Sequence, residues 1–216
     1  MKKAIVFAGS RGIGKAIAEQ LAAQKIEVVS TSTKTVDTSD LEQIERFCKS
    51  NQQTDILVLN TGGPPAKDFF EVSRDEWEKY HRQLFLGFCE VLQQVTINPG
   101  GYIFLITSCN IKEPDPKLVL SNAYRIAFSS VLKSLSKHYA AKQISCINIA
   151  PGPIKTDRLY SLVENMDEFE KTLPMKRAGM PEEIGRFVGA IVAQDIKYLS
   201  GVTINFDGAI SKYVLA

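Results

Sequence analysis

A glycine-rich segment near the start of the chain has the residue types and spacing of a phosphate-binding turn. Residues 8–14 are Ala-Gly-Ser-Arg-Gly-Ile-Gly, between an apolar run at 4–8 and helical apolar spacing over 13–24. Glycine allows close approach of backbone to a ligand, and a helix N-terminus offers free N–H groups and partial positive charge. The segment predicts a dinucleotide pyrophosphate site, the alternative being a tight turn without a ligand. The residues expected to form it are Gly9, Ser10, Arg11, Gly12, Ile13 and Gly14.

The residues after the second apolar run, 27–31, bear on the choice of dinucleotide. An NAD site usually has a carboxylate about 20 residues beyond its glycines, on the ribose hydroxyls. Residues 30–34 are Ser-Thr-Ser-Thr-Lys and include no acid. Arg11 and Lys34, with Thr31 and Ser32 beside them, are suited to a 2′-phosphate. We therefore expect NADP(H) as the preferred cofactor and NAD(H) as the second choice. In the alternative interpretation, Arg11 and Lys34 are solvated surface charges.

Strand-like and helix-like segments alternate along the chain and must position these residues. The expected strands are 4–8, 27–31, 55–60, 102–107, 144–150 and 201–206. The expected helices are 13–24, 41–48, 73–95, 118–141 and 181–193. Ser39 with Glu42, and Ser73 with Glu76, fit the S-x-x-E capping box that opens a helix. Apolar strands alternating with helices predict an α/β fold, a Rossmann-type doubly wound parallel sheet with helices on both faces, as a single domain over 1–216.

Composition excludes several classes of function. The chain has 216 residues and a formal net charge of +2, which argues against a nucleic-acid partner. No apolar run approaches the roughly 20 residues of a membrane span, and no signal-peptide core follows the N-terminus, so we expect a cytoplasmic protein without a membrane partner. The four cysteines are far apart and there are two histidines. We expect reduced thiols and no metal site.

Further motifs, taken together, resemble those of a known family. They are Asp37-Thr38-Ser39-Asp40, Asn60-Thr61-Gly62, Pro151-Gly152-Pro153-Ile154-Lys155-Thr156, residues 177–184, and residues 199–208. With the glycine turn they resemble the short-chain dehydrogenase/reductase family, especially its 3-oxoacyl carrier-protein reductase branch, over nearly the whole chain. The resemblance implies that Asp37 contacts the adenine. It also implies that further residues bind the cofactor, namely Asn60, Thr61, Gly62, Pro151, Gly152, Ile154 and Thr156.

The chain departs from the family pattern in its first third. Ala8 occupies the place of the first family glycine, so the turn is expected to sit differently. Only a few residues separate the second expected strand from Asp37, where the family has a helix and a strand. We expect that the helix after the second strand is deleted, with the third strand vestigial or the sheet edge rebuilt.

The catalytic tetrad of the family, Asn, Ser, Tyr and Lys, is largely replaced. Ser108 matches the family serine, whereas Ser121 stands at the tyrosine position, Arg125 at the lysine position and, counting back from the helix glycine, Leu84 at the asparagine position. A serine hydroxyl is a poor proton donor, and arginine, with a pKa above about 12, cannot relay protons. We expect Ser108 to polarise a carbonyl and Arg125 to hold the ribose, with Ser121, Tyr124 or water as the proton donor.

Several alternatives stay open at this stage. In the interpretation that competes with a proton-donor role, Tyr124 packs against a neighbouring helix or subunit. Cys109 is either a thiol donor or nucleophile, or an unactivated thiol. Residues 160–173 occupy the place of the family's substrate lid, and their apolar side chains either cover a substrate or pack the lid down. The resemblance implies a homodimer or homotetramer formed through helices 73–95 and 118–141. The expected function is an NADP(H)-dependent oxidoreductase interconverting a carbonyl and an alcohol on a small molecule; the alternative is a non-catalytic dinucleotide-binding protein, a sensor or silent subunit.

Overall fold

Six parallel strands form one sheet in the computed structural model, which describes residues 1–214. The strands are β1 (Lys3–Val6), β2 (Glu27–Ser30), β3 (Gln53–Leu59), β4 (Thr96–Ile106), β5 (Ser145–Pro151) and β6 (Val202–Phe206). Their order across the sheet is β2-β1-β3-β4-β5-β6. The chain therefore leaves β1 in one direction to reach β2 and returns to the other side of β1 for β3. This reversal creates a crevice beyond the carboxyl ends of β1 and β3, where ligands bind in such sheets.

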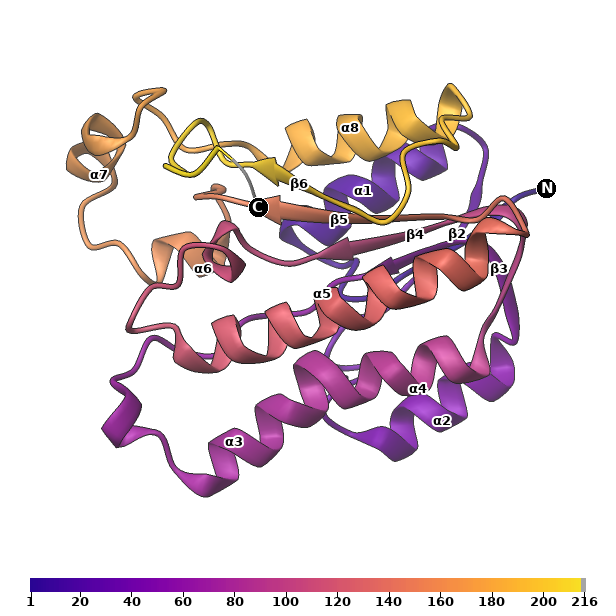
Figure 1. Ribbon diagram of the computed structural model, residues 1–216, viewed down its shortest axis with the longest axis horizontal. Helices are drawn as coiled ribbons and strands as arrows, with labels where there is room; N and C mark the ends of the chain where they lie inside the picture. Colours follow the sequence, from indigo (N-terminus) through magenta and orange to yellow (C-terminus); the bar gives the residue numbers. More distant parts are fainter. Residues whose placement is uncertain (215–216) are drawn as a thin grey trace.

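Helices cover both faces of the sheet, as Figure 1 shows. Helices α1 (Gly12–Ala23) and α8 (Pro181–Ala193) pack together on one face. Helices α2 (Leu41–Ser50), α4 (Gly87–Gln94) and α5 (Val119–Ala140) cover the other. Each face has its own buried apolar cluster, because alternate strand residues point to opposite sides. The expected doubly wound α/β fold is confirmed.

The sheet ends early at β2. Residues 31–40, all of them described, contain turns but neither helix nor strand before α2 begins. The helix expected to be missing is therefore absent, and the third strand of the family has gone with it. The cap of α2 differs from the expectation, since the Asp40 side chain accepts from the Gln43 backbone N–H at 3.1 Å. Ser39 instead donates to Asp37, at 2.8 Å from its hydroxyl.

The long helix expected over 73–95 is interrupted. Helix α3 (Arg74–His81) opens with the predicted Ser73–Glu76 capping box and runs into a π-helical turn (Arg82–Leu86) before α4. A π turn holds an extra residue, so side chains after it are displaced around the helix axis. Gly87, the first residue of α4, lets this helix approach the loop before α2, because a Cβ there would lie 2.5 Å from the Thr38 carbonyl oxygen.

Short helices lie beyond the carboxyl ends of the strands. Helices α6 (Asp157–Tyr160) and α7 (Met166–Thr172) project past this edge of the sheet (Figure 1). Single 3₁₀ turns occur at Phe69–Glu71 and Cys109–Ile111. Among residues 1–214, none of the helices has the length and apolar character needed to cross a membrane.

Candidate functional site

The backbone of the turn between β1 and α1 packs closely against neighbouring atoms of the chain. Ala8 and Gly12 adopt left-handed backbone conformations, with φ of 48° and 52°. A Cβ on Gly14 would lie 2.2 Å from the Ala8 carbonyl oxygen, and one on Gly9 would lie 2.7 Å from the Ser30 hydroxyl oxygen. These glycines are needed for the backbone to close the turn. Ala8 therefore takes up a conformation that usually needs glycine, at a cost of about 1–2 kcal/mol.

Thr31 supports this turn with both its backbone and its side chain. Its hydroxyl accepts from the Ala8 N–H at 3.1 Å, and its carbonyl accepts from the Gly9 N–H at 2.8 Å. The N-cap residue of α1, Arg11, makes no side-chain cap hydrogen bond. The first N–H groups of α1 thus keep their capacity to donate to an anion. A pyrophosphate fits this combination of glycine turn and uncapped helix.

The expected adenosine side is exposed and carries charges of both signs. Arg11 forms an ion pair with Asp157 at 3.4 Å, with both side chains well exposed. Lys34 is exposed, and its backbone N–H donates to the Ser32 hydroxyl at 3.3 Å. Asp37 accepts two hydrogen bonds from Ser39 through one carboxylate oxygen, at 2.9 and 2.8 Å. That local turn fixes Asp37 near the shortened edge of the sheet.

The segment after β3 faces the glycine turn across the crevice. The Asn60 amide donates to the Ala8 carbonyl at 3.5 Å and would lie 2.8 Å from a Cβ on Gly14. Thr61 shares a hydrogen bond of 3.0 Å with the Thr38 hydroxyl. A Cβ on Gly62 would meet no atom within 4 Å. The backbone is therefore tightly packed at Gly14, whereas the space beside Gly62 is open.

Arg125 connects α5 to the ends of two strands. Its Nε donates to the Ser121 hydroxyl at 3.1 Å, Nη1 to the Ile106 carbonyl at 2.8 Å and Nη2 to the Thr61 carbonyl at 3.2 Å. Burial, with a smaller contribution from the Arg158 charge, lowers the pKa of Arg125 to about 10, so the guanidinium stays charged at neutral pH. Three of its five N–H groups are occupied, which leaves two for a ligand.

Ser108 lies where β4 ends. Its hydroxyl oxygen accepts from the Asn110 backbone N–H at 3.2 Å and caps the short turn that follows. An acceptor role leaves the hydroxyl hydrogen for a carbonyl oxygen. Neighbouring Cys109 is poorly suited to nucleophilic chemistry, because burial and then Asp207 raise the pKa of its thiol.

Comparison with known proteins agrees with this geometry. The family model described as enoyl-(acyl carrier protein) reductase matches residues 34–211. The chain belongs to the short-chain dehydrogenase/reductase family. It is 28% identical to FabG, a 3-oxoacyl-[acyl-carrier-protein] reductase of Chlamydia trachomatis, and 28% identical to glucose 1-dehydrogenase 2 of Bacillus subtilis. The first comparison covers 97% of both chains, and the second covers 98% of this chain and 95% of the relative.

A solved member of the family has the same fold. A short-chain dehydrogenase from Burkholderia cenocepacia, in complex with NADP, superimposes with a TM-score of 0.86 at 22% identity over 96% of each chain. The chain thus has the short-chain dehydrogenase/reductase fold throughout the sheet, with the edge shortened at β2.

Two neighbouring residues of the π turn, Gln83 and Leu84, lie in different surroundings. Leu84, the position expected from counting, is only 2% exposed and lies in the core. Gln83 instead extends toward the segment after β3, and its Nε2 donates to the Gly62 carbonyl at 2.8 Å and to the Thr61 hydroxyl at 3.2 Å. Both residues belong to the π turn, whose extra residue changes the helical register. Sequence reasoning did not single out Gln83, although an amide directly before Leu84 was the available signal.

Tyr124 packs against α3. Its hydroxyl donates to the Trp77 carbonyl at 3.0 Å, and its ring packs edge-on to Trp77 with centroids 5.8 Å apart. Burial also raises the pKa of Tyr124, which makes the proton harder to release. Three residues along a helix rotate the side chain by about 300°, which sets Tyr124 about 60° from Ser121 around the axis of α5. The Tyr124 hydroxyl is thus engaged with α3, as in the packing interpretation of the sequence.

The segment after β5 lies against the glycine turn. The Gly152 N–H donates to the Phe206 carbonyl at 3.1 Å, and Ile154 is buried. The Thr156 methyl carbon would lie 3.2 Å from a Cβ on Gly12. Thr156 therefore borders the glycine turn, whereas Pro151 and Gly152 lie at the end of β5 beside β6. The apolar lid residues pack among themselves and against Ile210; they are Leu159, Val163, Met166, Phe169 and Leu173.

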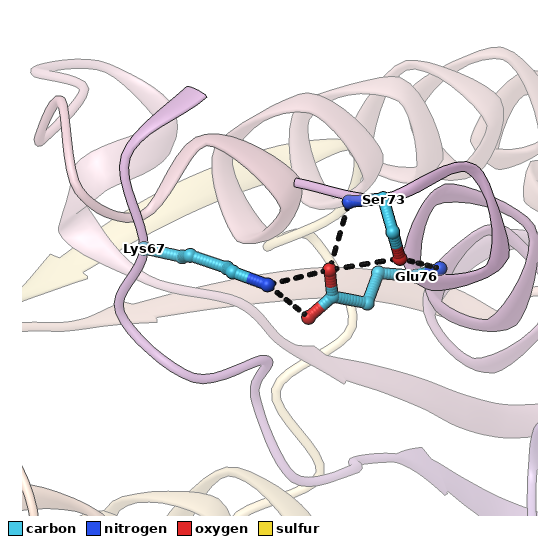
Figure 2. Close-up of polar contacts among 3 residues, drawn as sticks. All are labelled: Lys67, Ser73 and Glu76. Carbon is cyan, nitrogen blue, oxygen red and sulfur yellow. Dashed lines mark hydrogen bonds and ion pairs between the residues drawn. The ribbon is translucent and has the colours of Figure 1, made fainter. Parts of the chain in front are cut away.

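A charged cluster fixes the loop that follows Gly62. Figure 2 shows the Lys67 ammonium reaching both carboxylate oxygens of Glu76, at 3.0 and 2.8 Å. Glu76 also accepts from the Ser73 N–H at 2.8 Å, and these partners, Lys67 first, lower its pKa to about 2. The Lys67 N–H donates to the Lys117 carbonyl at 2.8 Å. The loop is thus held between the start of α3 and the segment before α5.

Proposed function

We propose that the chain is an NADP(H)-dependent oxidoreductase that interconverts a carbonyl and an alcohol on a small molecule. The observation that carries this proposal is the crevice between Gly14 and Gly62, which is closed to side chains behind the turn and open in front of it. Arg11 and Lys34, both exposed, support a 2′-phosphate and hence NADP(H). The NADP complex of the Burkholderia cenocepacia relative supports the same cofactor.

The polar groups beside the crevice suggest how the chain assists the reaction. NADP(H), when bound, supplies or accepts the hydride. Ser108 donates its free hydroxyl hydrogen to the carbonyl oxygen and stabilises the charge that develops there. Ser121, whose oxygen accepts from Arg125, keeps its hydrogen for substrate or for a water that delivers the proton. Arg125 adds a fixed positive charge on the same side and orients Ser121.

A titration followed by a rate measurement tests this function. NADPH and NADH are titrated into the full chain with nucleotide fluorescence as readout, and carbonyl compounds are then screened for NADPH oxidation. We expect micromolar NADPH binding, weaker NADH binding and turnover that Ser108→Ala reduces at least 100-fold. Equal binding of the two nucleotides would refute the cofactor preference, and unchanged turnover in Ser108→Ala would refute the role of Ser108.

A second candidate is a non-catalytic dinucleotide-binding protein, a sensor or silent subunit. It is favoured by the engagement of Tyr124 with α3 and of Arg125 with two carbonyl groups, which leaves no acidic phenol beside Ser121. This candidate predicts tight NADPH binding without hydride transfer to any carbonyl in the screen. The double variant Ser121→Tyr/Arg125→Lys should then gain reductase activity, because only the proton donor is missing.

We also propose that copies of the chain associate through helices 73–95 (α3 to α4) and 118–141 (α5), as the family resemblance implies. Ile126 on α5 is 46% exposed, which leaves an apolar contact on that helix. Light scattering on the purified chain measures its mass, and Ile126→Glu should shift a dimer or tetramer toward the monomer. A monomeric wild-type chain would refute this proposal.

A further inference from the structure

Arg158 lies half-buried above the turn that follows β3. It is the second residue of α6, and its Nη2 donates to the Pro64 carbonyl. A Cβ on Gly63 would lie 3.5 Å from its Nε. The Arg158 charge also contributes to the lowered pKa of buried Arg125, so the two guanidinium groups are close enough to repel each other. Both lie near the carboxyl ends of β3 and β4, the edge that holds the candidate site.

Neither arginine forms an ion pair within residues 1–214, where every ion pair involves other side chains. Arg125 donates to two carbonyls and a serine, and Arg158 donates to one carbonyl. Asp157, the nearest acid in sequence, pairs with Arg11 instead. Two like charges, one buried and one half-buried, are stabilised most directly by an anion that binds between them and the open crevice.

Geometry favours an anion on the substrate over a phosphate of the nucleotide. Thr156 lies against Gly12, and Asp157 lies against Arg11, so these two residues border the glycine turn. Arg158 lies instead over Gly63 and Pro64, and the phenol of Tyr80 on α3 is the other titratable neighbour that acts on its pKa. This side of the crevice is formed by the loop that Lys67 and Glu76 hold, away from the glycine turn.

We propose that Arg158 is a specificity-determining residue that binds a carboxylate of the substrate, so that the chain acts on oxo acids or hydroxy acids. The proposal rests on the oxidoreductase function proposed above. A guanidinium presents two parallel N–H groups that match the two oxygens of a carboxylate. Arg158 donates one of its five N–H groups to the Pro64 carbonyl, so four remain. Two of these can bind a carboxylate while the contact with Pro64 is kept.

A matched pair of ligands tests this inference on the full chain. The probes are 4-formylbenzoate and its methyl ester, which share an aldehyde and a ring but differ in charge. Binding of each is measured by calorimetry with saturating NADP⁺, which cannot reduce the aldehyde. We expect the acid to bind the wild type at least tenfold more tightly than the ester, as a charge-assisted hydrogen bond provides.

Three variants separate charge recognition from folding. Arg158→Gln should bring the acid-to-ester ratio close to one, and Arg158→Lys should retain part of the preference. Arg186→Gln, the same change at an exposed position on α8, should leave the ratio at the wild-type value. The ratio is taken within each variant, so a general loss of stability affects both probes alike.

Other outcomes would overturn the proposal. These are a wild type without preference for the acid, or a preference that survives in Arg158→Gln. Weaker NADP⁺ binding in Arg158→Gln with an unchanged ratio would assign the arginine to a nucleotide phosphate. If the wild type does not bind NADP⁺ at all, the proposed oxidoreductase function fails. The same acid-to-ester ratio, measured on the free chain, then decides the role of Arg158 separately.

Discussion

Replacing Arg125 by methionine tests whether this residue acts first as a structural connector. The change removes three hydrogen bonds, of 2.8, 3.1 and 3.2 Å, from a side chain that is 8% exposed. Hydrogen bonds to a charged group contribute about 1.5–3 kcal/mol each, so the loss is about 5–9 kcal/mol. Burial opposes this, because lowering the pKa from 12.5 to about 10 corresponds to about 3 kcal/mol.

The net prediction is that Arg125→Met lowers the free energy of unfolding by about 2–6 kcal/mol. Thermal or urea unfolding of the nucleotide-free chain measures it, and the thermal midpoint should fall by roughly 4–24 °C. Arg186→Met, at an exposed position of α8, is the matched control and should change stability by less than about 0.5 kcal/mol. A variant at position 125 as stable as this control would show that the guanidinium does not support the Thr61 and Ile106 carbonyls.

Three further predictions address the turn, the loop and the helix interface. Ala8→Gly should raise the free energy of unfolding by about 0.5–1 kcal/mol in urea denaturation, because φ is 48° there and the relief of strain exceeds the added chain entropy. The Glu76 pKa is lowered to about 2, so Glu76→Gln should be less stable than wild type above about pH 4.5, with the difference disappearing as pH falls toward 2 in acid titrations. Tyr124→Phe should lower stability by about 1 kcal/mol in thermal unfolding but leave the turnover number unchanged, whereas a loss of turnover would restore Tyr124 as a proton donor.

Much of the fold could be predicted because its signals are local. Apolar strands alternating with helices require a covered parallel sheet, and the glycine turn lies where β1 must meet α1. The shortened edge also followed from the sequence, since residues 31–40 are too few for a helix and a strand. The predicted N-cap of α2, Ser39, lies one residue before the observed N-cap, Asp40. Ser39 with Glu42 and Asp40 with Gln43 both have the spacing of a cap, and the structure forms the second pair.

The catalytic positions could not be predicted as fully, because they depend on helix register. A single π turn places Gln83 toward the site and Leu84 in the core, and no local pattern shows that an extra residue is present. The direction of Tyr124 was likewise decided by a partner, the α3 helix, whose position relative to α5 is a tertiary property. Arg158 was missed because its significance comes from the absence of a counter-ion among residues 1–214, which only the folded chain reveals.

The polar groups around Thr61 connect these departures from the family pattern. Gln83 and Thr38 bond its hydroxyl, and Arg125 bonds its carbonyl, so three separate elements meet at one residue after β3. Ser121 and Arg125, the residues that the sequence count places at the tyrosine and lysine positions of the tetrad, bond each other. These contacts link α5, the π turn and the loop before α2 through Thr61. In the function proposed above, proton delivery then depends on a hydroxyl or water, and substrate selection falls to groups outside the tetrad, such as Arg158.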